Sequence, residues 1–142
     1  MNSNEVHFDG KIAQKAIIVR DGAILLMRDP REKDEIWELP GGRLNVAEDP
    51  RVGLAREIFE ELGVHINVHE VVHMEQFFQH SERRNAFVIV YKATLFDSDA
   101  ELHLDDREVS EVRLVPFAEV ANYKLFPEYE RALRYYFANL PK

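Results

Sequence analysis

Three glutamates near the middle of the chain, Glu57, Glu60 and Glu61, have the type and spacing that could bind a metal ion. On a helix, residues three and four positions apart are neighbours, so these side chains fall within one narrow arc. Like charges at this spacing destabilise an isolated helix, and a bound divalent cation would offset the repulsion. Carboxylate oxygens are hard ligands of the kind that Mg²⁺ and Mn²⁺ prefer. The spacing therefore indicates a divalent-cation site on one face of a helix.

The residues that precede these glutamates could build the rest of such a site. Gly41 and Gly42 follow a proline, and without a Cβ atom they can bring the backbone close to the acidic face. Glu48 and Arg56 carry opposite charges and could pair, which would hold the intervening loop against the helix. The segment could thus bring backbone and carboxylate oxygens together.

The helix that must carry the glutamates has recognisable ends. Asp49 suits the N-cap, Pro50 suits the first helical position and Gly63 would end the helix, so we predict a helix over about Pro50 to Leu62. Its apolar stripe is expected opposite the carboxylates, with Ala55, Phe59 and Leu62 at the centre and Val52 and Ile58 at the margins. Gly53 is unusual inside a helix, where it costs about 1 kcal/mol relative to alanine, and close approach of a neighbouring loop would explain it.

The rest of the chain supplies short strands and one further helix. Strands are expected at 11–19, 23–28, 36–39, 64–68, 71–78, 86–96 and 111–115. A second amphipathic helix begins near Pro127, with apolar residues at Tyr129, Ala132, Leu133, Tyr136 and Phe137. Strands outnumber helices and do not alternate regularly with them. The predicted fold is therefore an α+β sandwich, a mixed sheet with helices packed on its faces.

Composition limits the class of protein. The chain has 142 residues, 46% of them apolar and 31% charged, which fits one globular domain over 1–142 with a loose polar tail at 1–10. It contains no apolar run long enough to span a membrane, and the lack of cysteine fits a reducing compartment, so we expect a cytoplasmic protein. The net charge of −8 argues against a nucleic-acid partner. A phosphorylated small molecule is compatible with it, provided that cations lie between carboxylates and phosphates.

The segment from Gly42 to Val64 resembles the Nudix box at every defined position. Counted forward from Gly42, the matching residues are Glu48, Arg56-Glu57-Ile58, Glu60-Glu61 and Gly63-Val64. The W-E-L-P-G sequence before the box, the L-L-M-R sequence upstream and E-V-S-E-V-R-L-V-P-F-A-E-V near the end are similar to small MutT-like members of the Nudix hydrolase family. The resemblance extends over nearly the whole chain.

This resemblance implies a Nudix-type α/β/α sandwich and divalent-metal hydrolysis of a nucleoside diphosphate linked to another group. Glu57, Glu60 and Glu61 would be metal ligands, together with a backbone carbonyl of Gly41 or Gly42. Mg²⁺ is the expected cofactor, with Mn²⁺ as an alternative.

The same resemblance implies roles for residues outside the glutamate cluster. Glu48 and Arg56 would orient the loop and the helix. Glu108 is similar to an acidic residue that some relatives bring from a late loop as an extra ligand or general base, and Glu111 is its rival. Arg28 matches an arginine that reaches a substrate phosphate in some relatives, although a surface arginine at a strand end is an equal alternative.

Histidines and aromatic residues offer further candidates. His65, His69 and His73 have a spacing that would suit a metal on a helix, but they lie on strand-like sequence and we expect a solvent-exposed strand face. Several aromatic residues could either stack on a nucleobase or fill the core: Trp37, Phe77, Phe78, Tyr123 and Phe126.

The predicted function is that of a pyrophosphohydrolase acting on a small-molecule nucleotide. The family markers of ADP-ribose, dinucleoside polyphosphate and coenzyme A hydrolases are absent, which favours a nucleoside triphosphate or a modified nucleotide as substrate. Alternatives are a nucleotide-sugar or ADP-ribose pyrophosphatase, a nucleotide-sensing module that does not hydrolyse its ligand, and an RNA-end hydrolase. A homodimer is compatible with the sequence.

Overall fold

The computed structural model of the chain describes residues 4–141. The elements, in chain order, are β1 (Gly10–Arg20), β2 (Ala23–Arg28), β3 (Gly41–Arg43), α1 (Pro50–Leu62), β4 (Ile66–Gln79), β5 (Arg84–Leu95), β6 (Glu111–Pro116), the 3₁₀ helix η1 (Phe117–Asn122) and α2 (Pro127–Ala138). The predicted bounds of the acidic helix are confirmed. None of the helices in residues 4–141 combines the length and the apolar character needed to cross a membrane.

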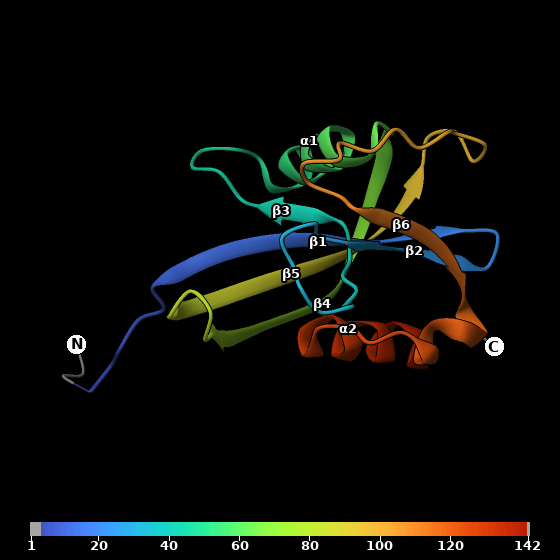
Figure 1. Cartoon of the computed structure of the whole chain (residues 1–142). Helices are drawn as coiled ribbons and strands as arrows, with labels where there is room; N and C mark the ends of the chain where they lie inside the picture. The colour runs from blue at the N-terminus through green and yellow to red at the C-terminus, as the bar shows by residue number, and fades with distance from the viewer. Residues whose placement is uncertain (1–3, 142) are drawn as a thin grey trace.

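Strand β1 is the centre of a mixed six-stranded sheet with the order β4-β5-β1-β2-β6, and β3 pairs with β1 off this path. β1 runs parallel to β5 and antiparallel to β2 and β3. Two strands share one edge of β1: its first half pairs with β3 and its last residues pair with β2 (Figure 1). The turn from β1 to β2 is made by Asp21 and Gly22, whose φ angles of 50° and 74° are of the kind that a tight type I′ hairpin needs.

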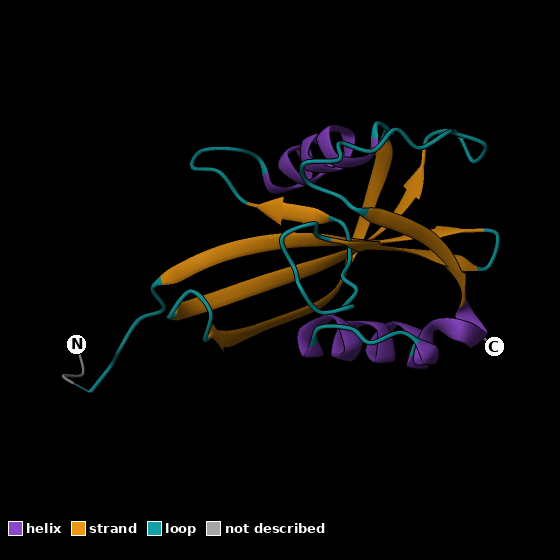
Figure 2. Cartoon of the chain, in the orientation of Figure 1, coloured by secondary structure: helices purple, strands orange, loops and turns teal. Residues whose placement is uncertain are grey.

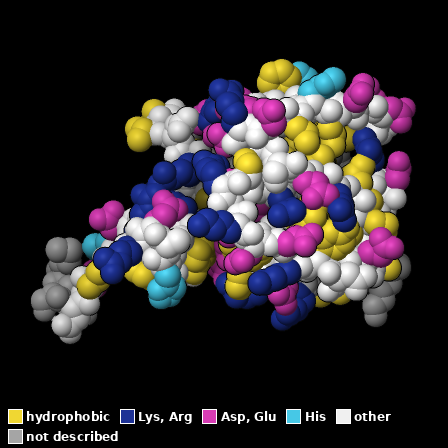
Figure 3. Space-filling view, viewed as in Figure 1, with side chains coloured by type: hydrophobic (Ala, Val, Ile, Leu, Met, Phe, Trp, Pro, Cys, Tyr) yellow, Lys and Arg dark blue, Asp and Glu magenta, His cyan; other side chains and the backbone are white. Residues whose placement is uncertain are grey.

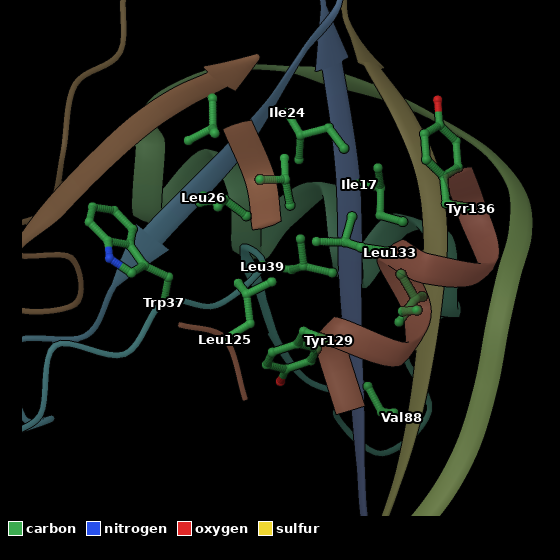
Figure 4. Packing of buried hydrophobic residues seen from close by; sticks show 14 residues of the cluster. Ile17, Ile24, Leu26, Trp37, Leu39, Val88, Leu125, Tyr129, Leu133 and Tyr136 are labelled. Carbon is green, nitrogen blue, oxygen red and sulfur yellow. The ribbon is translucent and has the colours of Figure 1, made fainter. Parts of the chain in front are cut away.

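The two long helices cover opposite faces of the sheet, α1 on one and α2 on the other (Figures 1 and 2). Successive residues of β1 point to opposite faces, so Ile17 packs in the cluster under α2 and Ile18 in the cluster under α1. The cluster under α2 includes Leu26, Val88, Leu133 and Tyr136 (Figure 4). This arrangement confirms the predicted α+β sandwich.

Two predicted strands differ from the observed ones. Residues 36–39 form no paired strand, because Trp37 and Glu38 make only isolated bridges, and the pairing with β1 begins at Gly41. The strands expected at 64–68 and 71–78 are one strand, β4, whose register with β5 shifts between Val68 and His73. The two strands predicted from the sequence are joined by an irregularity in the pairing with β5, which the sheet accommodates without ending the strand. Of the predicted tail, residues 4–9 lie outside any helix or strand, Gly10 begins β1, and residues 1–3 lie outside the described part.

The apolar stripe predicted for α1 is wrong in part. Phe59 and Val52 are 48% and 64% exposed, whereas Leu54, which was not predicted to face the sheet, is fully buried beside Ile58. The helix is rotated about its axis relative to the prediction, so that Glu61 points into the interior with only 6% of its surface exposed. In this orientation the carboxylate of Glu61 accepts a hydrogen bond from the backbone of the glycine pair.

Candidate active site

The glycine pair at the start of β3 holds the carboxylate of Glu61. The backbone N–H of Gly41 donates a hydrogen bond to Glu61 Oε1 over 3.0 Å. Gly41 has a φ of +139°, which side chains rarely allow, and a Cβ atom there would lie 2.1 Å from the carbonyl oxygen of Gln14. Only glycine therefore lets β3 approach both β1 and the helix at this point.

Glu57 rests on the second glycine of the pair. A Cβ atom on Gly42 would lie 2.6 Å from both Cδ and Oε2 of Glu57, so the carboxylate occupies the space that a side chain would fill. This contact and the hydrogen bond at Gly41 confirm that the glycine pair brings the backbone to the acidic face.

The loop before α1 is fastened to the helix as predicted. Arg56 donates from Nε to Glu48 Oε2 over 2.7 Å and from Nη2 to Glu48 Oε1 over 3.0 Å. The Glu48 carboxylate lies over Gly53, where a Cβ atom would be 2.6 Å from Oε1, and this explains the glycine inside the helix. The Asp49 side chain caps the helix by accepting hydrogen bonds from the backbone N–H of Arg51 and of Val52 over 3.0 and 3.2 Å.

Burial makes the two carboxylates at the glycine pair unusual. Loss of solvation raises the pKa of Glu61 to about 8, an effect that nearby Lys15 and the Gly41 N–H partly oppose. Burial also raises the pKa of Glu57 above its ordinary value, although Arg56 opposes the change. Both groups therefore lie where a bound cation would stabilise their ionised forms.

Lys15 is a site residue that the sequence analysis missed. Its Nζ lies 3.3 Å from Glu38 Oε1 and 3.5 Å from the carbonyl oxygen of Gly41. Burial alone would lower the pKa of Lys15, but nearby Glu38, Tyr129 and Glu61 outweigh that effect and hold the pKa above its ordinary value. The sequence did contain a signal for this residue, because a lysine directly before a run of apolar residues in a strand is unusual.

A cavity of about 940 Å³ opens beside these groups. Glu57, Glu61 and Gly41 line it together with aromatic side chains from β4 and the start of α2, namely Phe77, Phe78, Phe126 and Tyr129. Of the aromatic candidates named from the sequence, Trp37 is instead buried in the core at 3% exposure. The cavity thus joins a carboxylate cluster to an aromatic wall.

The structure separates Glu60 and Arg28 from this cavity. Glu60 is 56% exposed and accepts a hydrogen bond from Arg56 over 3.0 Å, and it is not among the lining residues. Arg28 also lies outside the lining, where it pairs with Glu111 over 3.5 Å and packs on the Trp37 ring. The roles predicted for Glu60 and Arg28 stay predictions.

Glu108 and its rival Glu111 have different surroundings. Glu108 borders the cavity, is 49% exposed and lies 3.4 Å from Arg31. Glu111 is outside the lining and is held by Arg28 and Arg113. The position of Glu108 is the more favourable of the two for contact with a molecule in the cavity.

No ready-made metal cluster of three or more His, Cys, Asp or Glu side chains is present in residues 4–141. His69 contacts Thr94, His65 stacks on Phe59, and His73 lies 3.5 Å from Glu75, so the histidines do not converge. The carboxylates that do gather are those of Glu57 and Glu61, which both lie against the backbone of the glycine pair.

Comparisons with known proteins agree with this geometry. The sequence model of the NUDIX domain matches residues 12–136. The CTP pyrophosphohydrolase of Escherichia coli is 44% identical over 63 residues, which cover 43% of this chain and 47% of that protein. The RNA pyrophosphohydrolase of Sphingopyxis alaskensis is 24% identical over 131 residues, 80% of each chain. The chain thus aligns with about half the length of the first of these relatives.

Solved structures share the fold. The solution structure of the E. coli ORF135 protein superposes with a TM-score of 0.76 and 28% identity, covering 92% of this chain and 91% of that one. The MutT NUDIX hydrolase from Burkholderia pseudomallei superposes with a TM-score of 0.77 and 25% identity, covering 87% and 95%. Since the NUDIX sequence model spans most of the chain and these structures share its architecture, the protein belongs to the NUDIX family.

Proposed function

We propose that this protein is a divalent-metal-dependent hydrolase that cleaves the diphosphate linkage of a nucleoside diphosphate derivative. The observation that carries the proposal is the position of two carboxylates, the buried Glu61 and the partly buried Glu57, against the glycine pair beside a large cavity. Membership of the NUDIX family supports it, and relatives of the chain are named pyrophosphohydrolases.

The residues present fit a divalent cation. Glu57 and Glu61 supply carboxylate oxygens whose charge is poorly solvated, and Gly41 supplies a carbonyl oxygen, a donor set that suits Mg²⁺ or Mn²⁺. We infer that these groups would hold the metal and that Glu60 would join them. Such an ion would polarise phosphoryl oxygens and lower the pKa of an attacking water.

Other residues of the chain would hold the loop and helix in place and accept the proton of the attacking water. Glu48 and Arg56 would hold the loop against α1, because their two hydrogen bonds join the loop to the helical turn where the glutamate cluster begins. Glu108 would accept the proton of the attacking water, since its partly exposed carboxylate borders the cavity.

The aromatic wall of the cavity supports a nucleoside as one part of the substrate. Phe77, Phe126 and Tyr129 can pack against a base, while basic side chains also line the cavity. On the face drawn in Figure 3, Lys and Arg side chains are interspersed with Asp and Glu, so the net charge of −8 does not make a uniformly acidic surface. A nucleoside triphosphate or modified nucleotide is the favoured substrate, and a nucleotide sugar or ADP-ribose is the second candidate.

The experiment that tests this proposal is a panel of nucleotides, nucleotide sugars and triphosphorylated RNA, assayed with Mg²⁺ and with Mn²⁺ in ¹⁸O-labelled water. We expect metal-dependent release of a phosphorylated product from at least one nucleotide, and the label identifies the phosphorus that water attacks. Nucleotide binding in calorimetry with no turnover of any compound would contradict hydrolysis and favour a sensing module.

A further inference from the structure

The buried ammonium group of Lys15 has no role in the reaction proposed above. Lys15 is the register partner of Gly41 in the pairing of β1 with β3, so the sheet itself places this side chain beside the glycine pair. The residue is only 7% exposed. Within residues 4–141, the buried polar or charged residues are Lys15, Glu61 and Gln14.

The surroundings of the Lys15 ammonium resemble those of a bound cation. Its neighbours are a carboxylate oxygen of Glu38 at 3.3 Å and the Gly41 carbonyl oxygen at 3.5 Å, and the Tyr129 ring centroid lies 5.5 Å away. The carbonyl oxygen of Gly41 is also a proposed metal ligand. Lys15 therefore contacts an oxygen atom that is also a proposed metal ligand.

A purely structural ion pair is a poor explanation for this lysine. On β1, Ala13 and Ile17 point to the same face of the sheet and pack in the cluster under α2, so an apolar side chain at position 15 would extend that cluster. Moving two charges out of water costs several kcal/mol per ion, and well-packed apolar residues are often as stable as a buried pair. Stability alone gives no reason for a charge at this position.

We propose that Lys15 is an internal counter-cation of the metal site, a positioning residue that limits how tightly the carboxylate cluster binds divalent ions. The proposal rests on the proposed function, since it assumes that Glu57, Glu61 and Gly41 bind metal. The positive charge of Lys15 neutralises Glu38 and part of the charge of Glu61. A divalent ion held by Glu57, Glu61 and Gly41 would also be repelled by the ammonium group, so it would bind less tightly. Less free energy is then needed to release the metal ion together with the product than from a site without Lys15.

The test is the affinity of the full chain for Mn²⁺ without substrate, measured from the electron paramagnetic resonance signal of free Mn²⁺. Replacing Lys15→Met removes one positive charge 3.5 Å from the carbonyl oxygen of Gly41, a proposed metal ligand. For a unit charge about 6 Å from a divalent ion in a water-like dielectric, this corresponds to about tenfold tighter binding. Lys11→Met is the matched control, because Lys11 lies on the same strand and lines the same cavity but pairs with Glu82. We expect the affinity of that control to stay within about twofold of the wild type.

A double variant, Lys15→Met with Glu38→Gln, keeps the test sharp if the single variant folds poorly. It removes one positive and one negative charge together, so its Mn²⁺ affinity should return close to the wild-type value and exceed that of Glu38→Gln alone by about tenfold. Equal affinities of the double variant and Glu38→Gln would overturn the proposal. Unchanged or weaker binding by a folded Lys15→Met protein, checked by circular dichroism, would overturn the proposal. Failure of the wild type itself to bind Mn²⁺ would instead contradict the metal site of the proposed function, so the two failures are distinguishable.

Discussion

At the scale of single residues, the environments of Glu57 and Glu61 explain why these carboxylates should matter for catalysis. Each is partly or largely removed from water and each lies against one glycine of the pair. We expect Glu57→Gln and Glu61→Gln to lower kcat by about 10²-fold or more, because each removes a negative charge that would balance the metal. Steady-state kinetics at saturating Mg²⁺ measure the loss, and circular dichroism checks the fold.

Glu130→Gln is a matched control for these two variants. Glu130 is an exposed helical glutamate, paired with Arg134 one turn away on α2, and it is not among the residues that line the cavity. Its kcat should be that of the wild type. Near-wild-type turnover in either Glu57→Gln or Glu61→Gln would contradict the metal assignment.

The raised pKa of Glu61 predicts a pH dependence of stability in the metal-free protein. The folded protein, with a Glu61 pKa of about 8 against an ordinary value of 4.5, binds this proton more tightly than the unfolded chain does. The resulting stability is full below pH 4.5 and is lost as the pH rises towards 8. Between these limits, we expect the Tm of metal-free wild type to fall by at least ~5 °C more than that of Glu61→Gln.

Calorimetric scans in a chelating buffer over this pH range provide the measurement. Addition of Mg²⁺ at the upper end should restore most of the lost Tm to the wild type and little to the variant, since a bound ion favours the ionised carboxylate. Parallel pH profiles of the two proteins would show that Glu61 titrates normally.

At the scale of elements, the loop before α1 and the helix work as one unit because Gly53 leaves room for Glu48. In Gly53→Ala, the new Cβ atom would lie 2.6 Å from Glu48 Oε1, so the carboxylate must move away from Arg56. The gain of about 1 kcal/mol in helix propensity offsets the weakened pair. We expect the free energy of unfolding to change by no more than about 1 kcal/mol while kcat/KM falls roughly tenfold.

Urea denaturation and kinetics of the same preparations separate these two effects. Val52→Ala is the control, since Val52 is the preceding residue on α1 and its side chain is 64% exposed. That variant should match the wild type in both measurements. A fully active Gly53→Ala protein would mean that the contact of Glu48 with the helix is dispensable.

At the scale of the whole molecule, two apolar clusters on opposite faces of one sheet hold the helices that form the site. Leu133 of α2 is 2% exposed in the cluster that also contains Ile17 and Val88 of the central strands (Figure 4). Leu133→Ala should lower the free energy of unfolding by about 2–5 kcal/mol, because it leaves a cavity in close-packed surroundings. Urea denaturation measures this change.

Leu104, which is 39% exposed, supplies the control position for Leu133→Ala. Leu104→Ala should change the free energy of unfolding by less than about 0.5 kcal/mol. Equal effects of the two substitutions would contradict the placement of Leu133 in the core.

The sequence by itself determined the local features of this protein. The N-cap at Asp49 and the stop at Gly63 defined α1, since capping depends on neighbouring backbone groups. The pairing of Glu48 with Arg56 and the family were also readable, because both depend on residue types at fixed spacing within one segment. Strand order depends on distant pairing and was not predicted, and the continuity of β4 was missed for the same reason.

Only the tertiary structure decided which charged groups surround the cavity. The rotation of α1 placed Glu61 inside and left Glu60 with Arg56, although the two glutamates are adjacent in sequence. The register of β1 with β3 brought Lys15 to Gly41, while the packing of Arg28 on Trp37 kept that arginine outside the cavity lining. These outcomes depend on contacts between segments far apart in the chain, and no spacing within a single segment encodes them.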